Sequence, residues 1–288
     1  MVILFVLLSF LFSGGETAFS FLKIEPSARG TSIAAFSSIS NDIGALYWNP
    51  AGTAIQRRII IGMNHLNYID NLNIEFLSGI FPFKFGNISF GYFYLGTNLK
   101  REKEDTSGLY SGEEGSFGYL ARVGILNYSR MVLKRVFLGG NVKFIREEID
   151  DASYDGSAVD IGAIYRIRRG AVSFCLKNIG RKLSVGEREF SLPFEILIGG
   201  FHRFKKFLIS LDISYPLRDN LGVLFGTSIN LFKNFSLRFG YKYKKDTFFK
   251  GIRAGFGTHI KGRIFIDYAF RIADFSVIHS FSIQYKGF

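Results

Sequence analysis

From residue 57 to the C-terminus, apolar and polar residues alternate along successive segments, which are separated by polar connections. The clearest segment is 206–215, in which Phe207 and Leu211 share one face while Ser210 and Asp212 share the other. A period of two is the pattern of a β-strand with two unlike faces. The alternation therefore predicts an all-β fold with fourteen strands. The predicted strands are 57–66, 71–82, 86–96, 115–128, 135–146, 157–168, 170–178, 192–203, 206–215, 220–232, 234–244, 251–260, 262–272 and 277–287.

The connections between these strands sort by length into two alternating groups. The first group, at 83–85, 129–134, 169, 204–205, 233 and 261, is uniformly short. The second group, at 67–70, 97–114, 147–156, 179–191, 216–219, 245–250 and 273–276, contains every long connection. Transmembrane barrels have short periplasmic turns, longer outer loops and an even number of strands. The pattern predicts a transmembrane antiparallel β-barrel in the bacterial outer membrane, which starts from its periplasmic end at residue 57.

The alternation also predicts which side chains face the lumen. An Arg or Lys that faces lipid at mid-membrane costs about 2–4 kcal/mol, so charged residues should point inward. Pairing with one another across the lumen is the favoured interpretation for any one of them, against a role in conduction. The inward charged set is Glu75, Arg122, Lys143, Asp160, Arg166, Glu195, Asp212, Arg238, Arg253, Asp267 and Arg271.

Several inward positions of the first five strands are instead large and apolar, which is unusual for a water-filled porin. They either line a path for a hydrophobic ligand or pack against a plug inside the barrel, and the sequence leaves both interpretations open. The inward apolar set is Leu77, Phe81, Phe93, Leu95, Leu120 and Phe137.

Composition excludes other classes of protein. Aromatic residues make up 17% of the 288 residues, which favours strands over helices. The net charge is +12, but the basic residues are scattered singly, so we expect no nucleic-acid binding. Cys175 is the only cysteine, and the four histidines are far apart in sequence. Because no enzyme motif is present either, we expect no catalytic residue, no cofactor and no metal site.

The N-terminus has the features of a secretory signal. Residues 2–12 are apolar apart from Ser9, and Ser13-Gly14-Gly15 offers the small residues of a cleavage site. This stretch is shorter than the roughly 20 residues of a transmembrane helix. We expect residues 1–18 to be a signal peptide cleaved after Gly15 or Ala18. The alternative interpretation is a short buried helix or strand.

The segment that precedes the barrel, residues 19–56, is not strand-like between Ser27 and Thr53. Asn41-Asp42 can cap a short helix over 43–47, and Pro50 would end it. Trp48, the only Trp, lies directly before Asn49-Pro50. It is either an interfacial Trp at the periplasmic rim or part of a small plug that enters the barrel from below. The domain prediction is therefore a plug at 19–56 followed by a barrel at 57–288.

This segment resembles the N-terminal signature of the PorV/PorQ group of outer-membrane proteins, within the broader FadL-like superfamily of fourteen-stranded barrels. The matching residues are Ala28-Arg29-Gly30 and the run 41–52, with weaker matches at 155–163, 176–180 and 192–193. The resemblance implies a plug or gate around Trp48, Asn49, Pro50, Ala51 and Gly52. In FadL-type barrels a hydrophobic ligand binds in the lumen, whereas PorV-type barrels serve type IX protein secretion.

The expected function is therefore a FadL-like channel for small hydrophobic molecules, and the alternative is a PorV-like component of secretion. The expected partners are outer-membrane lipid, a hydrophobic small molecule, and secretion or envelope proteins. A terminal aromatic residue, Phe288, ends an amphipathic last strand and resembles the insertion signal of outer-membrane barrels. The predicted lumen lining is Leu77, Phe93, Leu95, Leu120 and Phe137, with Arg122, Asp160, Asp212, Arg238 and Asp267.

Overall fold

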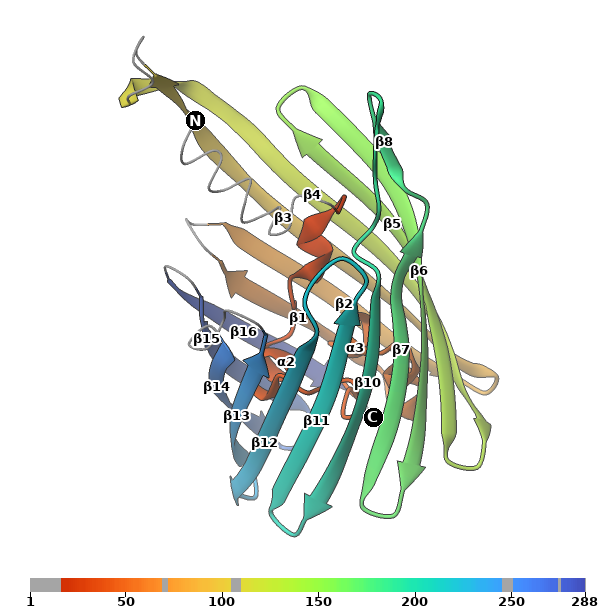
Figure 1. Cartoon of the computed structure of the whole chain (residues 1–288). Coiled ribbons are helices and arrows are strands. Elements are labelled where there is room, and N and C mark those ends of the chain that lie inside the picture. The colour runs from red at the N-terminus through yellow and green to blue at the C-terminus, as the bar shows by residue number, and fades with distance from the viewer. Residues whose placement is uncertain (1–16, 69–71, 105–109, 245–250, 274–275, 288) are drawn as a thin grey trace.

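The computed structural model describes residues 17–68, 72–104, 110–244, 251–273 and 276–287. Within these residues, fourteen antiparallel strands close into one barrel, in which the first strand pairs with the last (Figure 1). The predicted architecture is confirmed. The strands are β1 (Ile60–Asn67), β2 (Asn73–Phe83), β3 (Gly86–Glu104), β4 (Tyr110–Leu133), β5 (Val136–Ile149), β6 (Ala152–Ile167), β7 (Gly170–Gly180), β10 (Glu195–Phe204), β11 (Phe207–Pro216), β12 (Gly222–Phe232), β13 (Phe235–Tyr243), β14 (Ile252–Ile260), β15 (Ile264–Ile272) and β16 (Val277–Lys286).

The exterior of the barrel is an apolar belt. Large apolar side chains are exposed on the outward positions of the strands, as on β11, where Ile209 is 54% exposed and its neighbour Ser210 only 2%. Closure of the sheet pairs the backbone of every barrel strand, which a lipid environment requires. A closed barrel with an apolar exterior and a polar interior is the form in which strands cross the bacterial outer membrane, and that is where this protein resides. None of the helices in the described parts of the chain is long and apolar enough to span a membrane.

Several predicted outer loops are in fact strand. β3 and β4 stay paired from Asn87 to Glu104, through most of the predicted loop 97–114, and they extend beyond the other strands in Figure 1. β5 and β6 likewise continue to a turn at 150–151, within the predicted loop 147–156. Beyond the membrane both faces of a strand meet water. The alternation of apolar and polar residues is therefore lost there, although the strands remain paired. The predicted loop 179–191 contains a small hairpin, β8 (Leu183–Val185) and β9 (Arg188–Phe190).

The opposite end of the barrel carries only tight turns, at 84–85, 134–135, 168–169, 205–206, 233–234 and 261–263. The predicted sorting of short and long connections to opposite ends is therefore confirmed. We call the end with the tight turns the periplasmic end and the other the outer end, following the general asymmetry of such barrels. Residues 1–16 of the predicted signal peptide (1–18), the outer connection 245–250 and Phe288 lie outside the described residues, and the signal peptide stays a prediction.

The segment from Thr17 to Gln56, which we call the plug, lies inside the barrel (Figure 1). It holds four short helices: η1 (Ser20–Lys23), α2 (Ala28–Ile33), α3 (Ala45–Trp48) and η2 (Pro50–Ile55). Its first residues meet the outer end, where the Ala18 amide donates to the Ser191 carbonyl at 2.9 Å. Its last residues lead into β1 at the periplasmic end. The plug therefore occupies the lumen along its length, and not only the periplasmic rim.

Candidate functional site: a plugged lumen

The Asn49-Pro50-Ala51-Gly52 motif seats the plug on the inner wall of β3–β7. The Asn49 carboxamide oxygen accepts from the Ala51 amide at 3.0 Å, which caps η2, and its nitrogen donates to the carbonyls of Ala163 and Phe174. Pro50 occupies the first turn of η2, where its missing N–H costs nothing. Next to the motif, the Thr53 hydroxyl lies 2.8 Å from an Asn127 oxygen. The motif therefore joins the plug to several strands at once.

Glycines on the inner wall allow this close approach. A Cβ added at Gly162 would meet the Pro50 ring at 2.9 Å, and one at Gly139 would meet the Pro50 carbonyl carbon at 2.6 Å. Both distances are shorter than real Cβ contacts. On β12 and β13, Gly226 and Gly240 both lie against Ile33, so α2 also approaches the wall closely. Glycines at inward positions of the strands therefore mark where the plug contacts the wall. This signal is present in the sequence, but the prediction from alternating polarity made no use of it.

Trp48 belongs to the plug and not to the membrane interface. It is 3% exposed and packs edge-on against Phe36 and Tyr47, with Gly30 directly beside its ring. The interpretation of an interfacial Trp at the rim is therefore wrong. The helix expected at 43–47 is present as α3, one or two residues later, and Asp42 stabilises the turn before it by accepting from the Gly44 amide.

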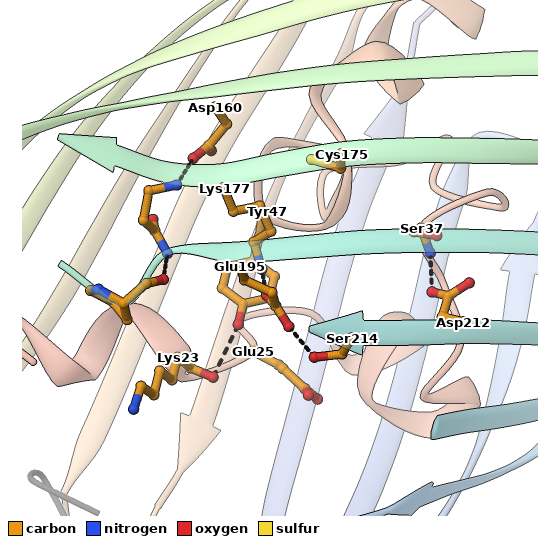
Figure 2. A network of polar contacts seen from close by, with 12 residues as sticks. Lys23, Glu25, Ser37, Tyr47, Asp160, Cys175, Lys177, Glu195, Asp212 and Ser214 are labelled. Atoms are coloured by element: carbon orange, nitrogen blue, oxygen red, sulfur yellow. Dashed lines mark hydrogen bonds and ion pairs between the residues drawn. The ribbon is translucent and has the colours of Figure 1, made fainter. Parts of the chain in front are cut away.

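Buried polar side chains of the wall hold the middle of the plug. The Ser37 amide donates to Asp212 at 2.8 Å (Figure 2). The Ser37 hydroxyl lies 2.7 Å from that of Ser173. On the other side of the lumen, Glu25 forms an ion pair with Arg253 of β14. These contacts use two residues, Asp212 and Arg253, that the sequence analysis had placed on the inner face.

Other lumen charges are paired within the wall. Lys143 lies 2.8 Å from Asp160, whose second oxygen accepts from the Asn178 amide. Arg238 pairs in the same way with Asp267. Each of these four charged residues is at most 7% exposed. Buried charges of this kind are tolerated only when they are paired and hydrogen-bonded.

A further pair lies at the outer end of the lumen. Lys177 and Glu195 are 3.1 Å apart, Ser214 donates to the same carboxylate, and the Tyr47 ring lies 3.9 Å below the Lys177 ammonium (Figure 2). The Tyr47 hydroxyl donates to the carbonyl of Lys23. Plug and wall therefore share one polar network here.

Three of the predicted lumen residues lie on the exterior instead. Leu77 is 56% exposed on the outer face of β2, and Leu120 and Arg122 occupy outward positions of β4, where Arg122 pairs with Glu148. Two other predicted inward residues are also on the exterior. Glu75 pairs with His65, and Phe81 stacks on the exposed Phe90. Phe93, Leu95 and Phe137, by contrast, are buried on the inner side.

The misplaced apolar residues have a common physical cause. The inner wall of β2–β4 packs against an apolar plug, so both faces of these strands carry apolar residues and the alternation loses its direction. On β2 the inward residues are Ile74, Phe76 and Ile80, each fully buried. Arg122 and Glu148 lie above the last outward apolar residue of β5, Phe144, where an outward charge costs little.

A small apolar cavity remains between the plug and strands β2–β5. Its free volume is only about 20 Å³, so the surrounding side chains nearly fill it. The plug contributes Phe21 and Leu22, and β3 contributes Phe93. Phe76, Val123 and Ile125 also line this cavity from the wall, and none of the three was predicted from the sequence. Lys143, which was predicted to point inward, is its only charged lining residue.

A second cavity, of about 80 Å³, lies beside β7 and β10–β13 and has many charged lining residues, and Leu22 and Tyr47 line both cavities. Its outer rim includes Asp219. Burial raises the pKa of the Asp219 carboxyl. Two hydrogen bonds, one from Lys244 at 2.6 Å and one from the Asn220 amide, outweigh this effect and hold the pKa below its ordinary value. The plug's Leu22 and Tyr47 thus lie between a cavity with charged lining residues and an apolar one. Within the described residues, no group of His, Cys, Asp and Glu is placed to hold a metal ion.

Comparison with solved structures places this architecture among known barrels. The chain resembles the Ralstonia pickettii toluene transporter TbuX, with a TM-score of 0.68 at 13% identity over 94% of this chain and 100% of that one. It resembles the Pseudomonas putida toluene transporter TodX with a TM-score of 0.65 at 12% identity, over 91% and 98%. A Pseudomonas aeruginosa FadL homologue gives 0.61 at 11%, over 90% and 98%.

At these identities the likeness shows the fold alone, which this chain shares with these three proteins. No protein-family model matches the chain, and no curated protein matches it with significance. The resemblance to the PorV/PorQ group therefore stays a prediction.

Proposed function

We propose that the barrel is an outer-membrane channel for small hydrophobic molecules, closed in this structure by its own plug. The observation that carries the proposal is the apolar lining of the lumen beside strands β2–β5. There the plug residues Phe19, Phe21 and Leu22 form one buried cluster with Phe76 and Phe93 of the wall. A water-filled channel has no use for such a lining, whereas a hydrophobic solute can replace plug side chains without exposing the wall to water.

The shared fold supports the same function. Two of the solved structures that resemble the chain are named as toluene transporters and a third as a FadL homologue, none of them an enzyme. We extend that class of cargo, a small hydrophobic molecule, to this barrel, and we propose no enzymatic role for it.

We propose residues 17–24 as the part of the plug that moves. They meet the wall through the hydrogen bond of Ala18 with Ser191, an ion pair of Lys23 with Asp219 at 4.0 Å, and the apolar packing of Phe19, Phe21 and Leu22. Residues 37–53, by contrast, are fixed by hydrogen bonds from Ser37 and Asn49 to the wall and from Thr53 to Asn127. Apolar contacts impose little geometric constraint on the groups that make them. Residues 17–24 can therefore move aside while the Asn49-Pro50 contact with the wall stays in place.

The test is uptake of toluene into liposomes that contain the refolded protein. Val123→Trp should fill the apolar cavity and reduce uptake at least fivefold, while Leu22→Ala should enlarge the cavity and increase uptake. Leu126→Trp is the matched control, because it adds the same ring to the same strand on the lipid side, where Leu126 is 52% exposed. Equal uptake by the Val123 and Leu126 variants would show that cargo does not pass through this cavity.

A role in protein secretion is the alternative that the N-terminal motif predicts. It requires partner proteins in the envelope, and a strain that lacks the protein would then retain its exported substrates. Normal export combined with lost hydrocarbon uptake in that strain would support the channel.

A further inference from the structure

A third lumen cavity, of about 290 Å³, lies at the periplasmic end between the plug and strands β12–β16. It shares no lining residue with either cavity of the outer half. Its lining is mostly polar, and it opens toward the tight turns. The proposed passage of hydrophobic molecules assigns it no role.

Positive charge is in excess around this cavity. Arg29 of the plug, Lys233 of the turn after β12, Arg238 of β13 and Lys286 of β16 all line it, and Asp267 is the only carboxylate that does. One more carboxylate, Asp42, lies behind Arg29 at 3.2 Å. Four cations therefore face two anions.

The two carboxylates are already engaged by the two arginines. Asp42 pairs with Arg29, and Asp267 pairs with Arg238 at 2.5 Å. Among the residues that the structure describes, neither Lys233 nor Lys286 has a carboxylate within ion-pair distance. Lys286 lies over the ring of Phe265, 4.4 Å from its centre. Both ammonium groups therefore remain available to a ligand.

Two further groups at this cavity lack a partner. Nδ1 of His259 and Oε1 of Gln284 are buried atoms without a hydrogen bond in the described structure. Both residues line the cavity. A histidine can place its proton on either nitrogen and a glutamine amide can be turned over, so each side chain can present an N–H to a ligand.

We propose that this cavity binds a small anion that carries a phosphate or carboxylate group. Two guanidinium groups, two ammonium groups and two potential N–H donors surround it, and such donors bind oxyanions through charge-assisted hydrogen bonds. Arg29 belongs to the plug and the other donors belong to the wall. A bound anion therefore bridges them and strengthens the attachment of the plug. This site is independent of what passes through the outer half of the lumen.

Calorimetric titration of the refolded protein in a neutral detergent, with inorganic phosphate and with citrate as probes, tests the proposal. The double variant Lys233→Gln/Lys286→Gln should bind at least about tenfold more weakly than the wild type, because it removes the two unpaired charges. The control is Lys134→Gln/Lys206→Gln, which removes two exposed lysines from other periplasmic turns and should leave affinity unchanged. Heat-modifiable gel mobility verifies that each variant is folded.

Hydrogen exchange provides a second readout. Saturating phosphate should slow exchange of plug amides 28–44 in the wild type and not in the Lys233/Lys286 variant, since a ligand stabilises the state that binds it. Equal affinity in the two double variants would overturn the site. So would binding of an acidic peptide without any binding of phosphate or citrate, because that result would indicate a protein partner instead.

Discussion

The distance between plug and wall is set at single residues. Gly162 and Gly139 let the Pro50 backbone and ring approach strands β5 and β6 more closely than any side chain would permit. Asn49 uses the same closeness to reach two carbonyls of the wall. The Asn49-Pro50 motif and these glycines therefore work as one contact.

Gly162→Val tests this contact. The added methyl groups would collide with Pro50, and overpacking of this kind costs about 1–3 kcal/mol. We expect faster hydrogen exchange at plug residues 45–56 while the barrel itself remains folded. The control is Gly124→Val, because an added Cβ there has no atom within 4 Å. Unchanged exchange in the Gly162 variant would mean that the plug does not depend on this approach.

Lys143 and Asp160 test the buried charges. Lys143→Met leaves Asp160 without its cation in a site with no exposure, which should destabilise the barrel by about 3–5 kcal/mol. The double variant Lys143→Met/Asp160→Asn removes both charges and should recover much of that loss. Urea unfolding in detergent micelles measures the free energy of unfolding of the single and of the double variant. A double variant no more stable than the single one would show that the pair is not coupled.

The residues that sequence analysis could and could not place differ in their surroundings. Asp160, Asp212 and Asp267 were placed correctly on the inner face, because the other face of each of their strands carries a row of large apolar residues there. Leu77 and Leu120 were misplaced, because an apolar plug makes the inner face resemble the lipid face. Alternation records polarity, and it cannot distinguish lipid from a buried apolar contact.

At the scale of elements, the strands were predictable and their outer ends were not. Within the membrane each strand meets lipid on one side, so period-two alternation located nearly all of them within a few residues. β3 and β4 leave the membrane before they end, and their last residues carry no such contrast. The plug helices were missed except α3, because four to six residues are too few to show helical periodicity.

Two engineered disulfides test which part of the plug moves, in a Cys175→Ser background that removes the native thiol. The disulfide of Ser37→Cys/Ser173→Cys links two positions whose hydroxyls now lie 2.7 Å apart, and it fixes the middle of the plug to the wall. Thr17→Cys/Ser191→Cys joins a bridged pair and fixes its outer end. Toluene uptake should persist with the first disulfide and be lost, reversibly with reductant, with the second. Loss of uptake with the Ser37–Ser173 disulfide would instead show that the whole plug must move.

At the scale of the molecule, the barrel is a membrane-spanning wall around a lumen divided into two unlike halves. The outer half is apolar and nearly filled by residues 17–24 beside β2–β5, and it carries a charged cavity beside β7 and β10–β13. The periplasmic half holds a polar, basic cavity, and the Asn49-Pro50 seat fixes the plug to the wall. This division excludes a permanently open aqueous pore and favours a solute that can take the place of apolar plug side chains.

The most direct test of this account compares two solutes in liposomes that contain the wild-type protein. We predict toluene uptake well above that of protein-free liposomes, with no increase for a hydrophilic solute of similar size such as glycerol. Val123→Trp should return toluene uptake toward the protein-free rate. Rapid glycerol entry through the wild-type barrel, or toluene uptake no faster than without protein, would contradict a plugged hydrophobic channel.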